Sequence, residues 1–193
     1  PRFRLDAEMI RDSVLFSSGL LVEKFGGKSV KPPQPEGVWE AVAMIGSNTR
    51  NYKADTGENL YRRSMYTFWK RSVPPVNLVA LDAPSRETCT VRRERTNTPL
   101  QALVLLNDPT FVEAARHLAE RMIAAGGDDA RVAIARGVEL VIARPPTEEE
   151  SAILLAEYEK QRASFAADVG AAEALLAVGE SSRDESLDPV AHA

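Results

Sequence analysis

Apolar residues recur every three to four positions along most of this chain, the spacing that places them on one face of an α-helix. No stretch shows the alternation of apolar and polar residues that is typical of a half-buried strand. We therefore predict a mostly α fold: an irregular multi-helix domain with long ordered loops and little or no sheet. The periodicity predicts helices over residues 5–21, 38–45, 60–72, 98–107, 109–126, 130–144, 148–167 and 171–178.

Two of these helices begin with a capping box, in which residues three positions apart satisfy each other's free backbone N–H groups. The first pairs Thr98 with Gln101 and has Pro99 at the first helical position, where proline is well tolerated. The second pairs Thr147 with Glu150. Residues 100–106 are apolar on almost every side, so we expect this helix to lie in the middle of the fold.

We expect the helices to form one domain over residues 1–193. The chain begins without Met at the start of a predicted helix, and it stops soon after a new segment begins, so the domain is expected to be truncated at both ends. Within it we distinguish N-terminal helices and a Pro-rich segment in 1–45, a signature core in 60–125 and C-terminal helices in 130–178.

The composition excludes several classes of protein and site. No apolar run is as long as the roughly 18 residues that a membrane span needs, so the chain is not expected to be membrane-spanning. Cys89 is the only cysteine, which excludes an internal disulfide, and we expect it to be a small packed residue. His117 and His192 have no further ligand at metal-binding spacing, so we expect no metal site.

An arginine-rich segment lies directly before the helix that begins at Thr98. Guanidinium groups bind carboxylate, sulfate or phosphate through paired hydrogen bonds, and a helix N-terminus adds N–H donors. The segment is therefore a candidate anion site. The alternative is that nearby acids, namely Asp82, Glu87 and Glu94, pair with the arginines and lock the loop. The four arginines are Arg86, Arg92, Arg93 and Arg95.

The net charge of the whole chain argues against nucleic acid as the partner of this arginine-rich segment. The net charge is −4, and no known nucleic-acid-binding motif is present, so we expect no nucleic acid as a partner.

Aromatic and cationic residues are interleaved just upstream of the arginines. Tyr66 and Trp69 lie beside Lys70 and Arg71 and are candidates for stacking on sugar rings or cations. The alternative is that these aromatic residues belong to the core. If the domain is an enzyme, Asp82 is the candidate acid–base residue, because an arginine lies close to it in the sequence.

Long motifs in this part of the chain resemble a known family. The motifs are residues 61–75, 82–87, 93–103 and 106–109, and residues 32–37 and 176–181 agree as well. They are similar to the C-terminal domain of secreted planctomycete cytochrome-c-type proteins, known as domain of unknown function fifteen fifty-three.

The resemblance implies a setting and not a mechanism, because the family has no agreed catalytic residues. It implies an extracytoplasmic location, periplasmic or secreted, and other domains of the same polypeptide as partners. It places haem c on a separate domain of the full-length protein and implies no cofactor in this chain.

Three functions stay open on the sequence alone. The first is a helical module that binds a neighbouring domain or an acidic or sulfated polysaccharide through its arginines. The second is part of an enzyme that acts with a haem domain in carbohydrate-linked oxidation. The third is a purely structural docking domain.

Overall fold

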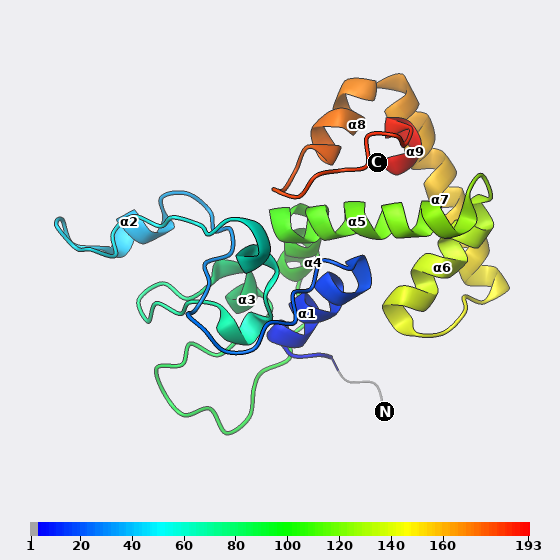
Figure 1. Ribbon diagram of the computed structural model, residues 1–193. Coiled ribbons are helices and arrows are strands. Elements are labelled where there is room, and N and C mark those ends of the chain that lie inside the picture. Colours follow the sequence, from blue (N-terminus) through cyan, green and yellow to red (C-terminus); the bar gives the residue numbers. More distant parts are fainter. Residues whose placement is uncertain (1–3) are drawn as a thin grey trace. The chain divides into compact units, whose positions relative to one another are not determined.

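The computed structural model describes residues 4–193 and is mostly helical (Figure 1). Strand-like pairing within these residues is limited to isolated bridges, one of which joins Val22 to Arg62. The predicted mostly α fold is therefore confirmed. The helices are α1 (Ala7–Ser18), α2 (Val38–Val42), α3 (Val76–Ala80), α4 (Pro99–Asn107), α5 (Pro109–Gly126), α6 (Ala130–Ile142), α7 (Glu148–Ala167), α8 (Val169–Leu176) and α9 (Pro189–His192), with 3-10 turns η1 (Gly57–Tyr61) and η2 (Ser64–Tyr66).

The contacts of the chain cluster into two compact units, which we describe separately. The first unit holds the residues up to 13 together with residues 21–108. The second unit holds residues 14–20 and 109–193. Helix α1 thus contributes its first half to one unit and its second half to the other.

Two buried arginines organise the irregular backbone of the first unit. Arg11 is 1% exposed, and its guanidinium donates to the carbonyl oxygens of Leu60 and Arg62 at 2.7 and 2.9 Å. Arg62 in turn donates to the carbonyl oxygens of the glycine-containing segment 24–28. Buried carbonyl groups need hydrogen-bond donors, and here the side chains supply what a helix or sheet would otherwise supply.

The same contacts explain why the helix predicted over residues 60–72 is absent. The segment instead forms η1 and η2 and then pairs with residues near Val30. The carbonyl groups of Leu60 and Arg62 accept from Arg11, so they are not used by N–H groups four residues further on. The prediction of a helix here was wrong. The apolar residues of this segment pack at separate places along an irregular backbone and not on one face of a helix.

Helix α4 has the predicted capping box but not the predicted burial. Thr98 and Gln101 cap each other, and Pro99 is the first helical residue. Leu100, Leu103 and Leu106, however, are each more than half exposed. The prediction that this helix lies in the middle of the fold was wrong: the side chain that it buries most fully is that of Gln101, which is held by hydrogen bonds.

The second unit is a helical assembly in which α5 and α6 lie side by side as a hairpin (Figure 1). A Cβ atom on Gly126 would lie 2.5 Å from the backbone nitrogen of Ala133, so only glycine allows this close approach. The apolar face of α5 buries Phe111 and Ala114. Helix α7 has the predicted capping box at Thr147 but fully buries none of its residues.

Candidate functional site

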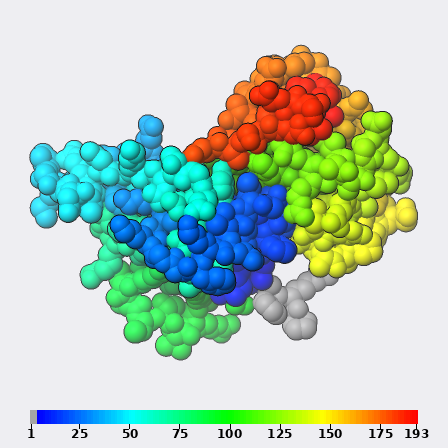
Figure 2. Space-filling view, viewed as in Figure 1, coloured from blue at the N-terminus to red at the C-terminus, as the bar shows by residue number. Residues whose placement is uncertain are grey.

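The arginines lie in the first unit on an exposed loop between α3 and α4, residues 86–96, which we call the arginine loop. In Figure 1 it is the green loop that extends away from the helices, and in Figure 2 it is part of the green surface. Both Asp82 and Arg86 take left-handed backbone conformations, with φ of 69° and 63°. Such conformations interrupt a helix, so α3 does not extend into the loop.

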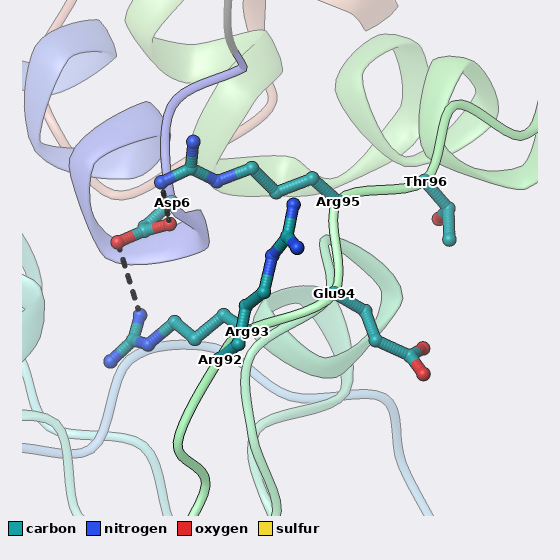
Figure 3. A pocket seen from close by; sticks show the side chains of 6 residues that line it. All are labelled: Asp6, Arg92, Arg93, Glu94, Arg95 and Thr96. Carbon is teal, nitrogen blue, oxygen red and sulfur yellow. Dashed lines mark hydrogen bonds and ion pairs between the residues drawn. The ribbon is translucent and has the colours of Figure 1, made fainter.

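Two carboxylates at the start of α1 hold the loop: Asp6 directly precedes the helix, and Glu8 lies in its first turn. Arg93 binds Glu8 through both of its terminal nitrogens, at 2.6 and 3.3 Å, and this contact raises the pKa of Arg93. Arg95 lies 3.3 Å from Asp6, which is also 3.7 Å from Arg93 (Figure 3). Arg86 is 3.7 Å from Glu8. Three guanidinium groups therefore share two carboxylates.

Asp6 and Glu8 were not predicted from the sequence as partners of the arginines. The predicted partners of the arginines were Asp82, Glu87 and Glu94, but Glu87 instead lies 3.5 Å from Arg71, outside the loop. The actual partners, Asp6 and Glu8, are about eighty positions away along the chain, at the start of α1. Acids are common at helix N-termini, where the helix dipole favours them, so no local signal distinguishes these two residues.

Asp82 is an anchor for the end of the loop. Its carboxylate accepts hydrogen bonds from Thr96 N and Oγ1 at 2.7 and 2.8 Å and from Gln101 Nε2 at 3.1 Å. Burial alone would raise the pKa of Asp82, but these hydrogen bonds and the charge of Arg4 lower it. An ionised carboxylate with occupied oxygens suits an anchor better than an acid that must donate a proton at neutral pH.

One arginine of the loop remains available for a ligand. An open pocket of about 750 Å³ is lined by Asp6 and residues 92–96 (Figure 3). Arg92 is exposed and, within residues 4–193, has no hydrogen bond or ion pair. Figure 3 draws it without a dashed line, whereas Arg93 and Arg95 each contact Asp6. The pocket thus has three guanidinium groups in its wall, one of them unpaired.

The two candidate stacking residues lie in different places. Trp69 reaches the loop: the guanidinium of Arg86 lies 4.1 Å from its ring centroid, and its Nε1 donates to Ser85 O at 2.9 Å. Tyr66 instead packs under Arg62, at 4.0 Å, and its hydroxyl accepts from the backbone N–H of Gly26. Both rings are half-buried, and each already has a cation on one face. Trp69 is therefore the stacking candidate that belongs to the arginine loop.

Metal ligands, membrane-spanning helices and the cysteine are the remaining features that the sequence analysis considered. Among residues 4–193, no three His, Cys, Asp or Glu side chains are placed to hold a metal ion together. No helix in that range is both long and apolar enough to cross a membrane. Cys89, which was predicted to be packed, is exposed, so that prediction was wrong.

Comparison with known proteins gives one match. The family model PSD1, described as a protein of unknown function (DUF1553), matches residues 1–158. No curated protein and no solved structure matches the chain. The matched range includes α1 and the whole arginine loop and ends within α7.

Proposed function

We propose an anion-binding role for this chain, which belongs to the PSD1 family of proteins of unknown function. The observation that carries the proposal is Arg92, exposed and unpaired in the wall of a pocket that Arg93 and Arg95 also line. The ligand group is a carboxylate or a sulfate, because a planar guanidinium binds such groups through two parallel hydrogen bonds.

The ion pairs with α1 support binding because they hold the loop in place before a ligand arrives. Asp6 and Glu8 fix Arg86, Arg93 and Arg95, yet two carboxylates leave one of these three positive charges in excess. A preordered cationic loop loses less conformational entropy on binding than a mobile one. The unpaired Arg92 adds a further positive charge.

The open shape of the pocket favours a charged group that is part of a larger partner. An acidic or sulfated polysaccharide fits, since Trp69 beside the loop offers an aromatic ring for a sugar. A carboxylate on a neighbouring domain of the same polypeptide is the other source. We place this function in an extracytoplasmic, multidomain protein in which haem c is bound by another domain, as the family resemblance implies.

A second candidate, a purely structural role, is favoured by the pairing of three of the four arginines with α1. In that case the loop locks the start of α1, and Arg92 is a solvated surface residue. The carbohydrate-oxidation alternative draws no support from Asp82, whose pKa is lowered by hydrogen bonds that outweigh the effect of burial.

Calorimetric titration of the chain with dextran sulfate and with uncharged dextran tests the proposal. We expect binding of dextran sulfate only, weaker in 300 mM than in 50 mM NaCl because salt screens exposed charges. Arg92→Gln should weaken binding about fivefold, which corresponds to the roughly 1 kcal/mol of one exposed charge-assisted contact. Arg131→Gln is the matched control, because it removes an exposed arginine from α6.

Two results would overturn the proposal. One is the absence of salt-sensitive binding to dextran sulfate. The other is an equal loss of binding in the Arg92 and Arg131 variants, which would show attraction to positive charge in general. Either result would leave the structural role of the loop.

A further inference from the structure

The second unit holds a polar cluster that has no part in the arginine loop. Ser181 Oγ lies 2.7 Å from His117 Nε2, and His117 Nδ1 lies 3.0 Å from Glu120 Oε2. A hydroxyl, an imidazole and a carboxylate joined in this order form the nucleophile, base and orienting acid of a serine hydrolase, which is recognised by geometry and not by sequence order.

Helix α5 supplies the base and the acid. His117 and Glu120 are three residues apart, so they lie on the same face of the helix. Glu120 is held on its other oxygen by the backbone N–H of Asp184 at 3.1 Å, and His192 Nε2 lies 3.7 Å from it. The carboxylate that orients the imidazole is therefore itself held in position.

The segment after α8 supplies the serine on a tightly fixed turn. Glu113 Oε1 accepts from the backbone N–H groups of Glu180 and Ser181 at 2.9 and 2.7 Å. Gly179 has φ of 99°, and a Cβ atom there would lie 2.3 Å from Glu113 Cδ. The turn thus requires glycine, and it fixes the backbone of Ser181 against α5.

Burial of His117 favours a neutral imidazole. Burial lowers the pKa of His117 by more than the nearby Glu120 raises it, and Arg116 lowers it further. With the Nδ1 proton directed to Glu120, the Nε2 lone pair faces Ser181 Oγ and can accept its proton. Arg116 Nη2 donates to the same Oγ at 2.7 Å, so a cation stabilises negative charge on the Oγ as its proton leaves.

Glu113 competes for the proton of the serine. Its Oε1 is 2.5 Å from Ser181 Oγ, so the single hydroxyl proton has two acceptors, Glu113 and His117. Glu113 already accepts two backbone N–H groups at this oxygen. Giving the hydroxyl proton to His117 therefore still leaves the carboxylate with hydrogen-bond donors.

We propose that Ser181 is the nucleophile of an acyl-transfer site that hydrolyses carboxylic esters of short acyl groups. The Oγ attacks the ester carbonyl carbon while its proton moves to His117 Nε2. The bond to the alcohol breaks, and the alcohol takes the proton from His117. Water, deprotonated by His117, then attacks the acyl carbonyl carbon. The bond to Ser181 Oγ breaks, the carboxylic acid leaves, and the Oγ takes the proton back from His117. The acyl group is short because Glu113, Arg116 and His117 crowd the Oγ.

A fluorophosphonate probe and mass spectrometry test this on the unaltered chain. We expect the probe to be found on Ser181, faster at a pH where His117 is neutral, and p-nitrophenyl acetate to be hydrolysed. Ser182→Ala, which removes the adjacent exposed serine, should be labelled like the unaltered chain, whereas Ser181→Ala should not be labelled. His117→Gln should slow labelling about a hundredfold, the usual effect of losing a general base.

The unaltered chain decides the question even if a variant fails to fold. A probe that does not react with Ser181 would overturn the proposal and leave the cluster as a structural contact between α5 and the segment after α8. Labelling of Ser181 at an undiminished rate in a folded His117→Gln chain, checked by circular dichroism, would also overturn it, since the serine would then react without its base. Neither result depends on the arginine loop.

Discussion

At the scale of single residues, Asp82 fixes the local backbone between α3 and α4. Its left-handed backbone ends α3, and its carboxylate accepts three hydrogen bonds from Thr96 and Gln101. These contacts place the end of the arginine loop and the start of α4. Asparagine tolerates the left-handed conformation as well as aspartate does, so replacing Asp82 with asparagine tests the carboxylate and not the backbone.

We expect Asp82→Asn to lower the free energy of unfolding by about 1–2 kcal/mol at pH 7, because charge-assisted hydrogen bonds are lost. The pKa of Asp82 is lowered in the folded chain. Its contribution is therefore complete above the unfolded pKa of about 3.9 and is lost as the pH falls through the folded value. Urea unfolding at pH 7 and at pH 3 measures both effects. Glu94→Gln, an exposed acid of the same loop, is the control, and an equal loss in both variants would contradict the prediction.

Gly179 offers a second test at this scale. We expect Gly179→Ala to lower the free energy of unfolding by about 3 kcal/mol, because the alanine would be strained at the positive φ of this position and its Cβ atom would clash with the hydrogen-bonded Glu113. Gly127 also has a positive φ, of 55°, but a Cβ atom there meets nothing within 4 Å. Gly127→Ala should therefore cost only about 1 kcal/mol. Thermal and urea unfolding compare the two, and similar losses would contradict the clash.

At the scale of elements, the sequence predicted best where local signals determine the structure. The capping boxes of α4 and α7 are present, and α5 forms over the predicted residues 109–126. The face that α5 buries is partly polar, however, because it includes Glu113 and Arg116. Burial and irregular segments were harder, because they depend on distant residues. Nothing near residues 60–66 reveals that Arg11 takes their carbonyl groups, and nothing near Leu100 reveals that the leucines of α4 face outward.

The residues of the two candidate sites likewise fall into those that the sequence reveals and those that only the folded chain reveals. The arginine loop was predicted because four arginines in ten residues are unusual in any context, whereas Asp6 and Glu8 were missed because they are distant in sequence. His117 was noticed only as a lone histidine. Its spacing to Glu120 is visible in the sequence, but the approach of Ser181 depends on the turn at Gly179, which only the folded chain shows.

Helix α7 provides a test of capping, because it fully buries none of its residues and so relies on local contacts. We expect Thr147→Ala to lower the free energy of unfolding by about 1 kcal/mol, since the hydroxyl accepts the backbone N–H of Glu150, while Thr147→Ser should be nearly neutral. Hydrogen bonds from Arg144 and Thr147 lower the pKa of Glu150 to about 2. The helix should therefore lose this support only in acid, as the pH falls below about 4.3 toward that value. Circular dichroism during urea unfolding measures the change, and equal stability of the Ala and Ser variants would contradict it.

At the scale of the whole molecule, both units bury charged side chains beside their apolar cores. In the first unit, Arg11 and Arg62 are buried against backbone carbonyl groups, and α1 is paired to the arginine loop. In the second unit, Glu113 and Arg116 are buried beside His117. A buried histidine whose pKa differs between the folded and unfolded chain makes stability depend on pH just below neutrality.

His117 is such a histidine. Burial lowers its pKa, as do the charges of Arg116 and His192, although Glu120 and Glu113 act in the opposite direction. A histidine whose folded pKa lies below the unfolded value of about 6.5 binds more protons when unfolded. Stability should therefore be complete above that value and fall as the pH drops below it.

Thermal unfolding between pH 5 and 8 measures this dependence. The melting temperature of the unaltered chain should decrease from pH 7 to pH 5, and the decrease should be smaller in His117→Gln, whose side chain does not titrate. The variant also loses the contact with Glu120, so it should be less stable at pH 7, and the comparison is therefore between slopes. Equal slopes would show that other groups control the response. Because the measurement concerns unfolding and not reaction with a probe, its outcome holds whether or not Ser181 is a nucleophile.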